Sequence, residues 1–349
     1  MTNAASPASP TAPRPTRVVQ ADGPLDPDGL LADGRPTIFR GLARDWPLVA
    51  AGLAGADSAI AYLKRFDAGR PVVAYTGAPD IGGRFFYRDD WSGLNFEAGR
   101  VGLADFLDRI AGHAGDAAPP SFYIGSTDLD RYLPGFRGEN DLPLPSPPPD
   151  HDAPLASIWI GNRTIAQTHY DMSNNLAVCV AGRRRFTLFP PDQVGNLYPG
   201  PLEPTPGGQV VSMVDLSAPD HARYPRFAEA LAAAQVAELE PGDVLFYPAL
   251  WWHHVEATGD FNVLVNYWWN ATPAHADTPM TTLLHAILSL RDRPAAEKAA
   301  WAAMFDHYVF GDAATAGAHL PDHVRGELGP LNVRAARRLR AKIADRINR

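Results

Sequence analysis

The chain of 349 residues is long enough for one large domain or two ordinary ones. Its hydrophobic content of 46% and charged content of 20% are typical of soluble globular proteins, and its net charge of −8 argues against nucleic-acid binding by the molecule as a whole. The single cysteine, Cys179, excludes an internal disulfide and is typical of a reducing compartment. Because we find neither a signal-peptide pattern nor an apolar run of transmembrane length, we expect a cytoplasmic protein with no membrane partner.

The N-terminal third predicts a mixture of short strands and helices. Residues 1–16 are small, polar and proline-rich, and we expect them to be a disordered tail. Short runs of β-branched and aromatic residues predict strands at 37–40, 71–75, 84–88 and 121–125. A helix capped by Ser58 is predicted after the first strand, and apolar residues at i, i+3, i+4 and i+7 predict another around 103–110.

The middle of the chain is dense in predicted strands. A proline-rich stretch, 141–154, is incompatible with a helix or a central strand, so we expect a surface connection or a lid. One short helix is predicted at 227–236, and strands are predicted at 157–161, 169–189, 209–214, 242–247 and 252–269. Glycine- and proline-rich turns between short strands favour a double-sheet jelly roll over a βαβ fold. The expected fold class is mainly β with α, a jelly-roll core with flanking N-terminal helices.

The C-terminal part, 276–349, is predicted to be a helical region. Two apolar stripes at 280–288 and 301–309 have helical spacing, and the last helix is rich in arginine. These apolar stripes need to be buried, either against a partner subunit or against the β domain. The residues leave both options open. The arginine-rich helix is more typical of a solvated charged face than of a nucleic-acid site.

A possible metal site begins at His169 and Asp171. The two residues are two positions apart at a predicted strand, so both side chains leave the same face. A third imidazole would complete a triad of two histidines and one carboxylate, which suits a non-haem Fe(II) that keeps open positions. His253 and His254 both qualify, but neighbours on a strand face opposite sides, so only one can join. The pattern does not say which.

Three other polar residues interrupt apolar strands. Arg184 shares a strand face with Phe186 and Leu188, and a buried guanidinium needs an anion such as the distal carboxylate of a 2-oxoacid. The alternative is a solvated triplet of arginines. If Asn175 and Asn266 are buried, each amide requires a hydrogen-bond partner. The alternative is that each simply forms hydrogen bonds with the backbone.

Several motifs together are specific for one family. They are HYDxxxNL (169–176), GRRRFxLFPPDQ (182–193), PGDVLFYPxxWWHHVE (241–256) and VNYWW (265–269). The chain carrying them resembles the cupin-like JmjC oxygenases, which include the asparaginyl hydroxylase of hypoxia-inducible factor and many bacterial cupin-like proteins. With an entry strand near residue 36, the resemblance covers most of 35–275. It implies a double-stranded β-helix (cupin) domain over 17–275 that binds Fe(II) and uses 2-oxoglutarate as cosubstrate.

The resemblance also implies roles for individual residues. The metal and catalytic ligands would be His169, Asp171 and His253, which selects His253 over His254. The residues implied for the cosubstrate pocket are Tyr123, Asn175, Arg184, Asn266 and Trp268. Two positions depart from the family pattern. Well-studied relatives have lysine at Arg184, and the asparaginyl hydroxylase has threonine at Ala166, for which Thr164 or Thr168 could compensate.

The function implied is hydroxylation of a C–H bond, with a protein or peptide side chain as the leading substrate. The alternatives are a small-molecule or RNA-modifying oxygenase of the same superfamily, and a non-catalytic metal-binding cupin protein. Region 276–349 resembles, by position, the dimerisation region of the family's hydroxylases, so we expect a homodimer. A nucleic-acid partner is not expected.

Overall fold

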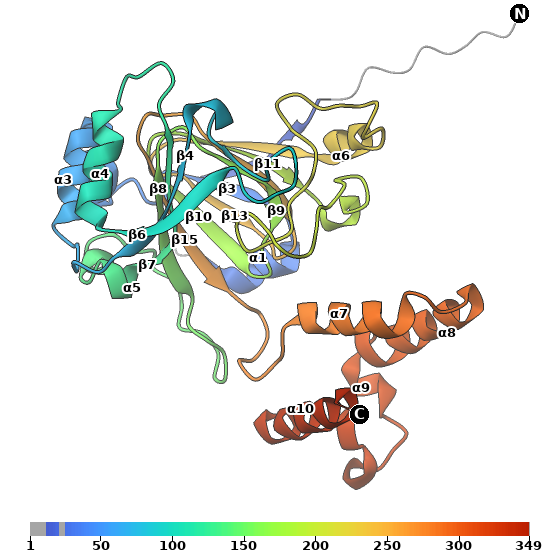
Figure 1. The fold of residues 1–349 in the computed structure, drawn as a ribbon. Helices are drawn as coiled ribbons and strands as arrows, with labels where there is room; N and C mark the ends of the chain where they lie inside the picture. Colours follow the sequence, from blue (N-terminus) through green and yellow to red (C-terminus); the bar gives the residue numbers. More distant parts are fainter. Residues whose placement is uncertain (1–11, 21–24, 349) are drawn as a thin grey trace, which may run out of the picture. The chain divides into compact units, whose positions relative to one another are not determined.

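The computed structural model of the protein describes residues 12–20 and 25–348 (Figure 1). The chain divides into two compact units. The first comprises the residues up to Pro147 together with Ala153–Asn270, and the second comprises Pro148–Asp152 together with Ala271–Arg349. Five residues of the proline-rich stretch therefore group with the C-terminal helices.

The centre of the first unit is a double-stranded β-helix of eight antiparallel strands, which confirms the predicted fold class. One half has the strand order β13-β10-β15-β8, and the facing half has the order β12-β11-β14-β9. The eight strands are β8 (Leu155–Gly161), β9 (Ile165–Tyr170), β10 (Asn174–Ala181), β11 (Arg184–Phe189), β12 (Gln235–Leu239), β13 (Val244–Tyr247), β14 (Trp252–Ala257) and β15 (Asn262–Trp269).

N-terminal strands extend both sheets. The larger sheet has nine strands in the order β2-β3-β13-β10-β15-β8-β7-β4-β6, and the smaller has six in the order β1-β12-β11-β14-β9-β5. The added strands are β1 (Arg14–Pro15), β2 (Arg17–Gln20), β3 (Thr37–Arg40), β4 (Val72–Gly77), β5 (Arg84–Phe85), β6 (Phe96–Val101) and β7 (Ser121–Asp128). Strands β5 and β7 contribute side chains to the site described below.

Strand β10 is buried along its whole length because both of its faces are covered. Leu176 and Val178 pack outward in a core shared with helices, whereas Ala177 and Cys179 pack inward between the two sheets. Figure 1 shows α3 (Ala56–Lys64) and α4 (Leu103–Gly112) side by side on the outer face of the larger sheet. The remaining helices of this unit are α1 (Pro27–Asp33), α2 (Pro47–Ala54), α5 (Leu129–Tyr132) and α6 (Phe227–Ala233).

Three predicted elements differ in the structure. The helix predicted at 227–236 ends at Ala233, and β12 follows it because its residues pair with β11. The stretch 209–214 forms isolated bridges in place of a strand. Ser58 lies inside α3, whose N-cap position is Gly55, so the predicted cap is wrong.

The segment expected to be a disordered tail also differs in its described part. Arg14 and Pro15 form β1, which pairs in parallel with Gln235 and Val236. Thr16 is buried, and its backbone N–H donates to the carbonyl of Val236. The correction has a physical reason: the edge of the smaller sheet supplies backbone partners that composition does not reveal. The earlier residues of the expected tail, 1–11, lie outside the described part.

The second unit is helical, with α7 (Pro279–Leu290), α8 (Ala295–Phe305), α9 (Ala313–Ala316) and α10 (Val333–Ile347). Neither α7 nor α8 contains a buried residue, and large apolar side chains such as Leu288 and Trp301 are exposed. In the described residues of the chain, we find no helix with the length and apolar character needed to span a membrane.

Candidate metal centre

Strand pairing brings the two histidines of the triad together. His253 on β14 lies directly opposite His169 on β9, and the two ring centroids are 4.2 Å apart. Asp171 follows the end of β9, and its Oδ2 lies 3.7 Å from Nε2 of His253. One potential ligand atom from each of the three residues lies within 4.8 Å of the others. This donor set, two imidazoles and a carboxylate, fits a non-haem Fe(II) with open coordination positions.

Backbone carbonyls orient both imidazoles. Nδ1 of His169 lies 2.7 Å from the carbonyl oxygen of Gln167, and Nδ1 of His253 lies 3.0 Å from that of Trp251. Each Nδ1 therefore carries the proton and donates, which leaves the Nε2 lone pair for a metal. Burial and the neighbouring His169 lower the pKa of His253 to about 4, with Asp171 opposing the shift, so its ring is neutral near pH 7.

The structure also decides between the two adjacent histidines. His253 lines the same cavity as His169 and Asp171, whereas His254 is buried on the opposite face of β14. There Nδ1 of His254 lies 3.2 Å from the hydroxyl oxygen of Thr168. Burial, followed by the charge of Arg84, lowers the pKa of His254 to about 3. His254 is therefore a neutral core residue beside the candidate metal centre.

The carboxylate of Asp171 is held by a pair of buried amides. Nδ2 of Asn175 donates to Oδ2 of Asp171 at 2.9 Å, and Nδ2 of Asn266 donates to Oδ1 of Asn175 at 2.6 Å. Both asparagines are at least 97% buried. Partners of this kind fix the orientation of a metal-ligating carboxylate.

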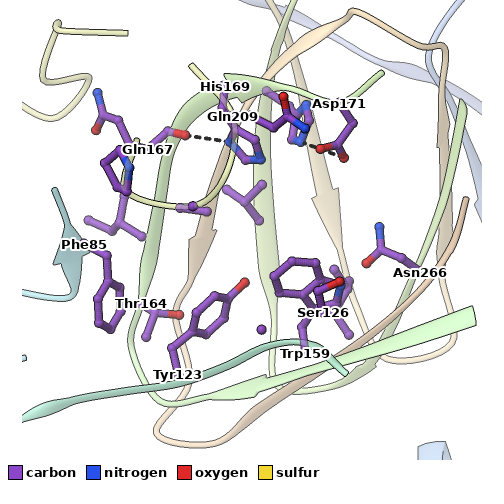
Figure 2. A pocket seen from close by; sticks show the side chains of 18 of the residues that line it. Phe85, Tyr123, Ser126, Trp159, Thr164, Gln167, His169, Asp171, Gln209 and Asn266 are labelled. Carbon is purple, nitrogen blue, oxygen red and sulfur yellow. Dashed lines mark hydrogen bonds and ion pairs between the residues drawn. The ribbon is translucent and has the colours of Figure 1, made fainter. Parts of the chain in front are cut away.

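The triad opens into a cavity of about 430 Å³. Four of the five residues predicted for the cosubstrate pocket line it: Tyr123, Arg184, Asn266 and Trp268. The fifth, Asn175, is fully buried behind the wall, where it bridges Asp171 and Asn266. Figure 2 shows His169, Asp171 and Gln209 toward one end of the cavity, with Tyr123, Thr164 and Trp159 toward the other.

Arg184 is the main charged feature of the cavity besides the triad. Its side chain is 3% exposed, and its Nε and Nη2 atoms have no hydrogen-bond partner among the residues that the structure describes. Burial lowers the pKa of this guanidinium. A buried cation without a partner is costly, and a carboxylate matches its planar fork of donors. The residues present therefore fit a dicarboxylate cosubstrate whose distal group meets Arg184.

The structure also shows which threonine could compensate for Ala166, the position where the asparaginyl hydroxylase has threonine. Ala166 and Thr164 both line the cavity, whereas Thr168 faces away from it toward His254. Thr164 is 2% exposed. Of the two threonines that could compensate for Ala166, only Thr164 is on the correct face.

Aromatic residues that the sequence analysis did not single out line much of the cavity. Phe85 stacks on Tyr123 with ring centroids 5.8 Å apart, and Tyr123 stacks on Trp159 at 5.7 Å. Tyr75 and Phe96 complete this group. Alternation within the predicted strand 84–88, which puts Phe85 on the face opposite Arg84, was the available signal.

A buried glutamine behind His169 was also missed. Nε2 of Gln167 donates to the carbonyls of Ser212 and Val214 at 2.8 and 2.7 Å. Its Oε1 accepts from Nε of Arg84 at 3.0 Å, and Arg84 forms an ion pair with Asp215 at 3.3 Å. This network ties strand β9 to segment 211–215. No pattern in the sequence indicates it, because the partners lie more than forty residues from Gln167.

Comparisons with known proteins agree with this geometry. The family model of the cupin-like domain matches residues 26–275. The lysine-specific demethylase JMJ31 of Arabidopsis thaliana is 35% identical over 132 residues, which cover 36% of this chain and 24% of that protein. The Jumonji C domain-containing protein 5 of Drosophila melanogaster is 27% identical over 241 residues, covering 68% of this chain and 55% of that protein. The tRNA wybutosine-synthesizing protein 5 of Gallus gallus is 38% identical over 107 residues, covering 31% of this chain and 30% of that protein.

The matches thus span from about a quarter to just over half of these relatives' length. The family model alone covers more than half of this chain, and the fold and triad geometry are those that the resemblance implies. The chain belongs to the cupin-like family, in the JmjC group of the Fe(II)/2-oxoglutarate oxygenase superfamily.

Proposed function

We propose that this protein is an Fe(II)- and 2-oxoglutarate-dependent oxygenase that hydroxylates a C–H bond of a protein or peptide side chain. The observation that carries the proposal is one cavity that contains both a complete triad and a buried, unsatisfied guanidinium within the described residues. The triad would hold the iron, and Arg184 would hold the distal carboxylate of the cosubstrate. When bound, iron would let dioxygen act as the oxidant, with one oxygen atom used to oxidise 2-oxoglutarate to succinate and carbon dioxide and the other available for the C–H bond of the substrate.

The protein's own residues contribute ligation, orientation and exclusion of water. The Nε2 atoms of His169 and His253 are presented as ligands because their Nδ1 atoms donate to carbonyls. The aromatic residues Phe85, Tyr123 and Trp159 give the cavity an apolar lining, which keeps bulk water from the reacting groups.

A protein substrate is supported by the JmjC relatives, one of which is named as a lysine-specific demethylase. A relative named for tRNA wybutosine synthesis supports the runner-up, an RNA-modifying or small-molecule oxygenase. The net charge of −8 favours the protein substrate over a polyanion. A non-catalytic metal-binding cupin protein is the third possibility.

Release of succinate from 2-oxoglutarate tests the activity. The purified protein, given Fe(II) and air, should consume the cosubstrate, and consumption should rise when cell extract is added. Asp171→Ala should abolish turnover, whereas His254→Ala should retain it because His254 lies outside the cavity. Mass spectrometry of the treated extract should then find a +16 mass shift on peptides.

The alternatives give different results in the same assay. A +16 shift confined to RNA or to small metabolites would replace the protein substrate with the runner-up. A protein that binds Fe(II) through the triad but never consumes 2-oxoglutarate, with or without extract, would be a non-catalytic cupin protein.

A further inference from the structure

Strand β9 contains a β-bulge immediately before His169. His253 of β14 pairs with His169. The next pair is Val255 with Ala166, so the pairing register shifts between the two pairs. The single β14 residue between these partners therefore lies opposite two residues of β9, 167–168. An extra residue of this kind interrupts the alternation of side chains along a strand. It explains why Ala166 and His169, which are three positions apart, both line the cavity.

The side chain of Gln167 anchors the bulge to a neighbouring segment. Its Nε2 donates to the carbonyls of Ser212 and Val214 at 2.8 and 2.7 Å, and the residue is 3% exposed. Its Oε1 accepts from Nε of Arg84 at 3.0 Å. On the backbone, the N–H of Ser212 donates to the carbonyl of Thr168 at 2.7 Å. Both residues of the bulge are thus fastened to the segment that contains Ser212 and Val214.

Both ends of the Gln167 amide require the same orientation. The guanidinium of Arg84 can only donate hydrogen bonds and backbone carbonyls can only accept them, so a reversed amide would lose its contacts at both ends. Arg84 is itself held by an ion pair with Asp215 at 3.3 Å, and its Cζ lies 4.0 Å from the centroid of the Phe86 ring. The side chain of Gln167 therefore has one defined position, which fixes the backbone of the bulge.

The backbone of Gln167 orients the first histidine of the triad. Its carbonyl oxygen lies 2.7 Å from Nδ1 of His169, a contact drawn as a dashed line in Figure 2. The backbone of His169 also forms a bridge with Val211, which lines the cavity. A hydrogen bond to Nδ1 sets the direction in which an imidazole presents Nε2 to a metal. A displacement of the bulge would therefore redirect a candidate metal ligand.

We propose that Gln167 is a positioning residue for the candidate metal centre: its side-chain amide fixes the β-bulge, and its carbonyl holds the ring of His169 with Nε2 directed toward the metal. The inference rests on the metal site of the proposed function, and it gives Gln167 a role beyond stability. A side chain that only stabilised the fold would change the free energy of unfolding without changing the metal affinity of the folded protein.

Metal binding by two variants of the full-length protein tests the inference. Gln167→Met removes the amide, whereas Gln167→Glu, as a carboxylate, keeps the acceptor toward Arg84 but has no N–H for the two carbonyls. Titration with Mn(II), at a temperature at which circular dichroism shows folded protein, should give a Kd about tenfold higher for both, the lower end of the range for residues that support metal ligands. The visible spectrum of the Co(II)-loaded protein should change as well, because it reports ligand geometry.

Asn140→Leu is the matched control. Asn140 is a fully buried amide that accepts from the backbone N–H of Leu48 and donates to the carbonyl of Phe136. Its loss should destabilise the protein and leave both the Mn(II) Kd and the Co(II) spectrum unchanged. Wild-type metal affinity in either folded Gln167 variant, or an equal loss of affinity in Asn140→Leu, would overturn the inference.

Failure of the proposed function gives a different result. If the wild type binds Mn(II), loses binding in Asp171→Ala and never consumes 2-oxoglutarate with Fe(II) and air, the oxygenase activity is refuted. The titrations still decide the role of Gln167 in that case, because they need no turnover. A wild type that binds no Mn(II) would overturn the positioning role together with the metal site.

Discussion

Arg184 and His253 lie on the same face of neighbouring strands and are offset by four residues. Leu188 of β11 pairs with His253, and Arg184 at the start of the same strand pairs with Ala257. At a rise of about 3.3 Å per residue, the backbones of Arg184 and His253 are separated by about 13 Å along the sheet. The cavity thus has a candidate metal ligand and a cation displaced along one face, at a spacing that suits a dicarboxylate bound between them.

Arg184→Met should separate stability from cosubstrate binding. The substitution removes a buried cation that lacks a full set of partners, so the free energy of unfolding of the ligand-free protein should stay the same or rise. A ligand at 100 times its Kd stabilises a protein by about 2.7 kcal/mol, and this gain from 2-oxoglutarate should vanish. Thermal unfolding of the Mn(II)-loaded protein, with and without cosubstrate, measures both effects. Arg185→Met, on the opposite face and half-exposed, is the control. Retained stabilisation in Arg184→Met would place the anchor elsewhere.

His253→Ala and His254→Ala should differ in metal binding although the residues are adjacent. The first removes a metal ligand, whereas the second removes a core imidazole that contacts Thr168. We expect Fe(II) or Mn(II) binding to be lost in His253→Ala and retained in His254→Ala. Equilibrium dialysis with metal analysis gives the stoichiometry. Equal loss in both variants, with both still folded by circular dichroism, would contradict the assignment of His253.

Asn175→Ala should weaken metal binding without removing a metal ligand. Asn175 donates to Oδ2 of Asp171, and loss of such a supporting hydrogen bond typically costs about 10- to 100-fold in metal affinity. Titration with Mn(II) measures the change. Asn174→Ala is the matched control, because the Asn174 amide bonds the backbone of Trp269 and Ala249. The same loss of affinity in both variants would indicate a general effect on the fold.

Gln167→Leu should destabilise the protein through unsatisfied backbone groups. The substitution leaves the carbonyls of Ser212 and Val214 without the side chain that donates to them. Each buried group left unsatisfied costs about 1–3 kcal/mol, so the free energy of unfolding should fall by at least about 2 kcal/mol. Urea unfolding measures it. The exposed Gln20→Leu should stay within about 0.5 kcal/mol of wild type. A Gln167→Leu protein as stable as this control would show that other groups satisfy those carbonyls.

The exposed apolar side chains of the helical unit predict self-association. Leu288 is 79% exposed, and Trp301 is 44% exposed. We propose that a second copy of the chain covers them, so light scattering of the full-length protein should give twice the chain mass of 37.7 kDa. Combined Leu288→Glu and Trp301→Glu should give the monomer mass. Leu53→Glu on α2, where Leu53 is 70% exposed, should not change the assembly. A monomeric wild type, or a dimer unaffected by the double substitution, would refute this interface.

The strand-rich core was predictable because its signals are local. The short strand-forming runs of 157–161 and 242–247 and the helical spacing of 103–110 each correspond to an observed element. Elements that depend on distant partners were not predictable. The first two residues of β12, Gln235 and Val236, were predicted to end a helix, since only pairing with β11 identifies this strand, and Arg14–Pro15 was predicted to be part of a tail. A backbone hydrogen bond to a distant edge leaves no trace in local composition.

The sequence by itself determined the chemistry available to this protein: two histidines and a carboxylate in strand context, an arginine on an apolar face, and the family to which they point. Tertiary structure alone decided how these groups act. Strand parity leaves the choice between His253 and His254 open and the family resemblance implies His253, but only the register of β14 against β9 places His253 opposite His169. The hydrogen bonds from Asn266 to Asn175 and from Asn175 to Asp171 likewise exist only because the fold brings these three side chains into contact.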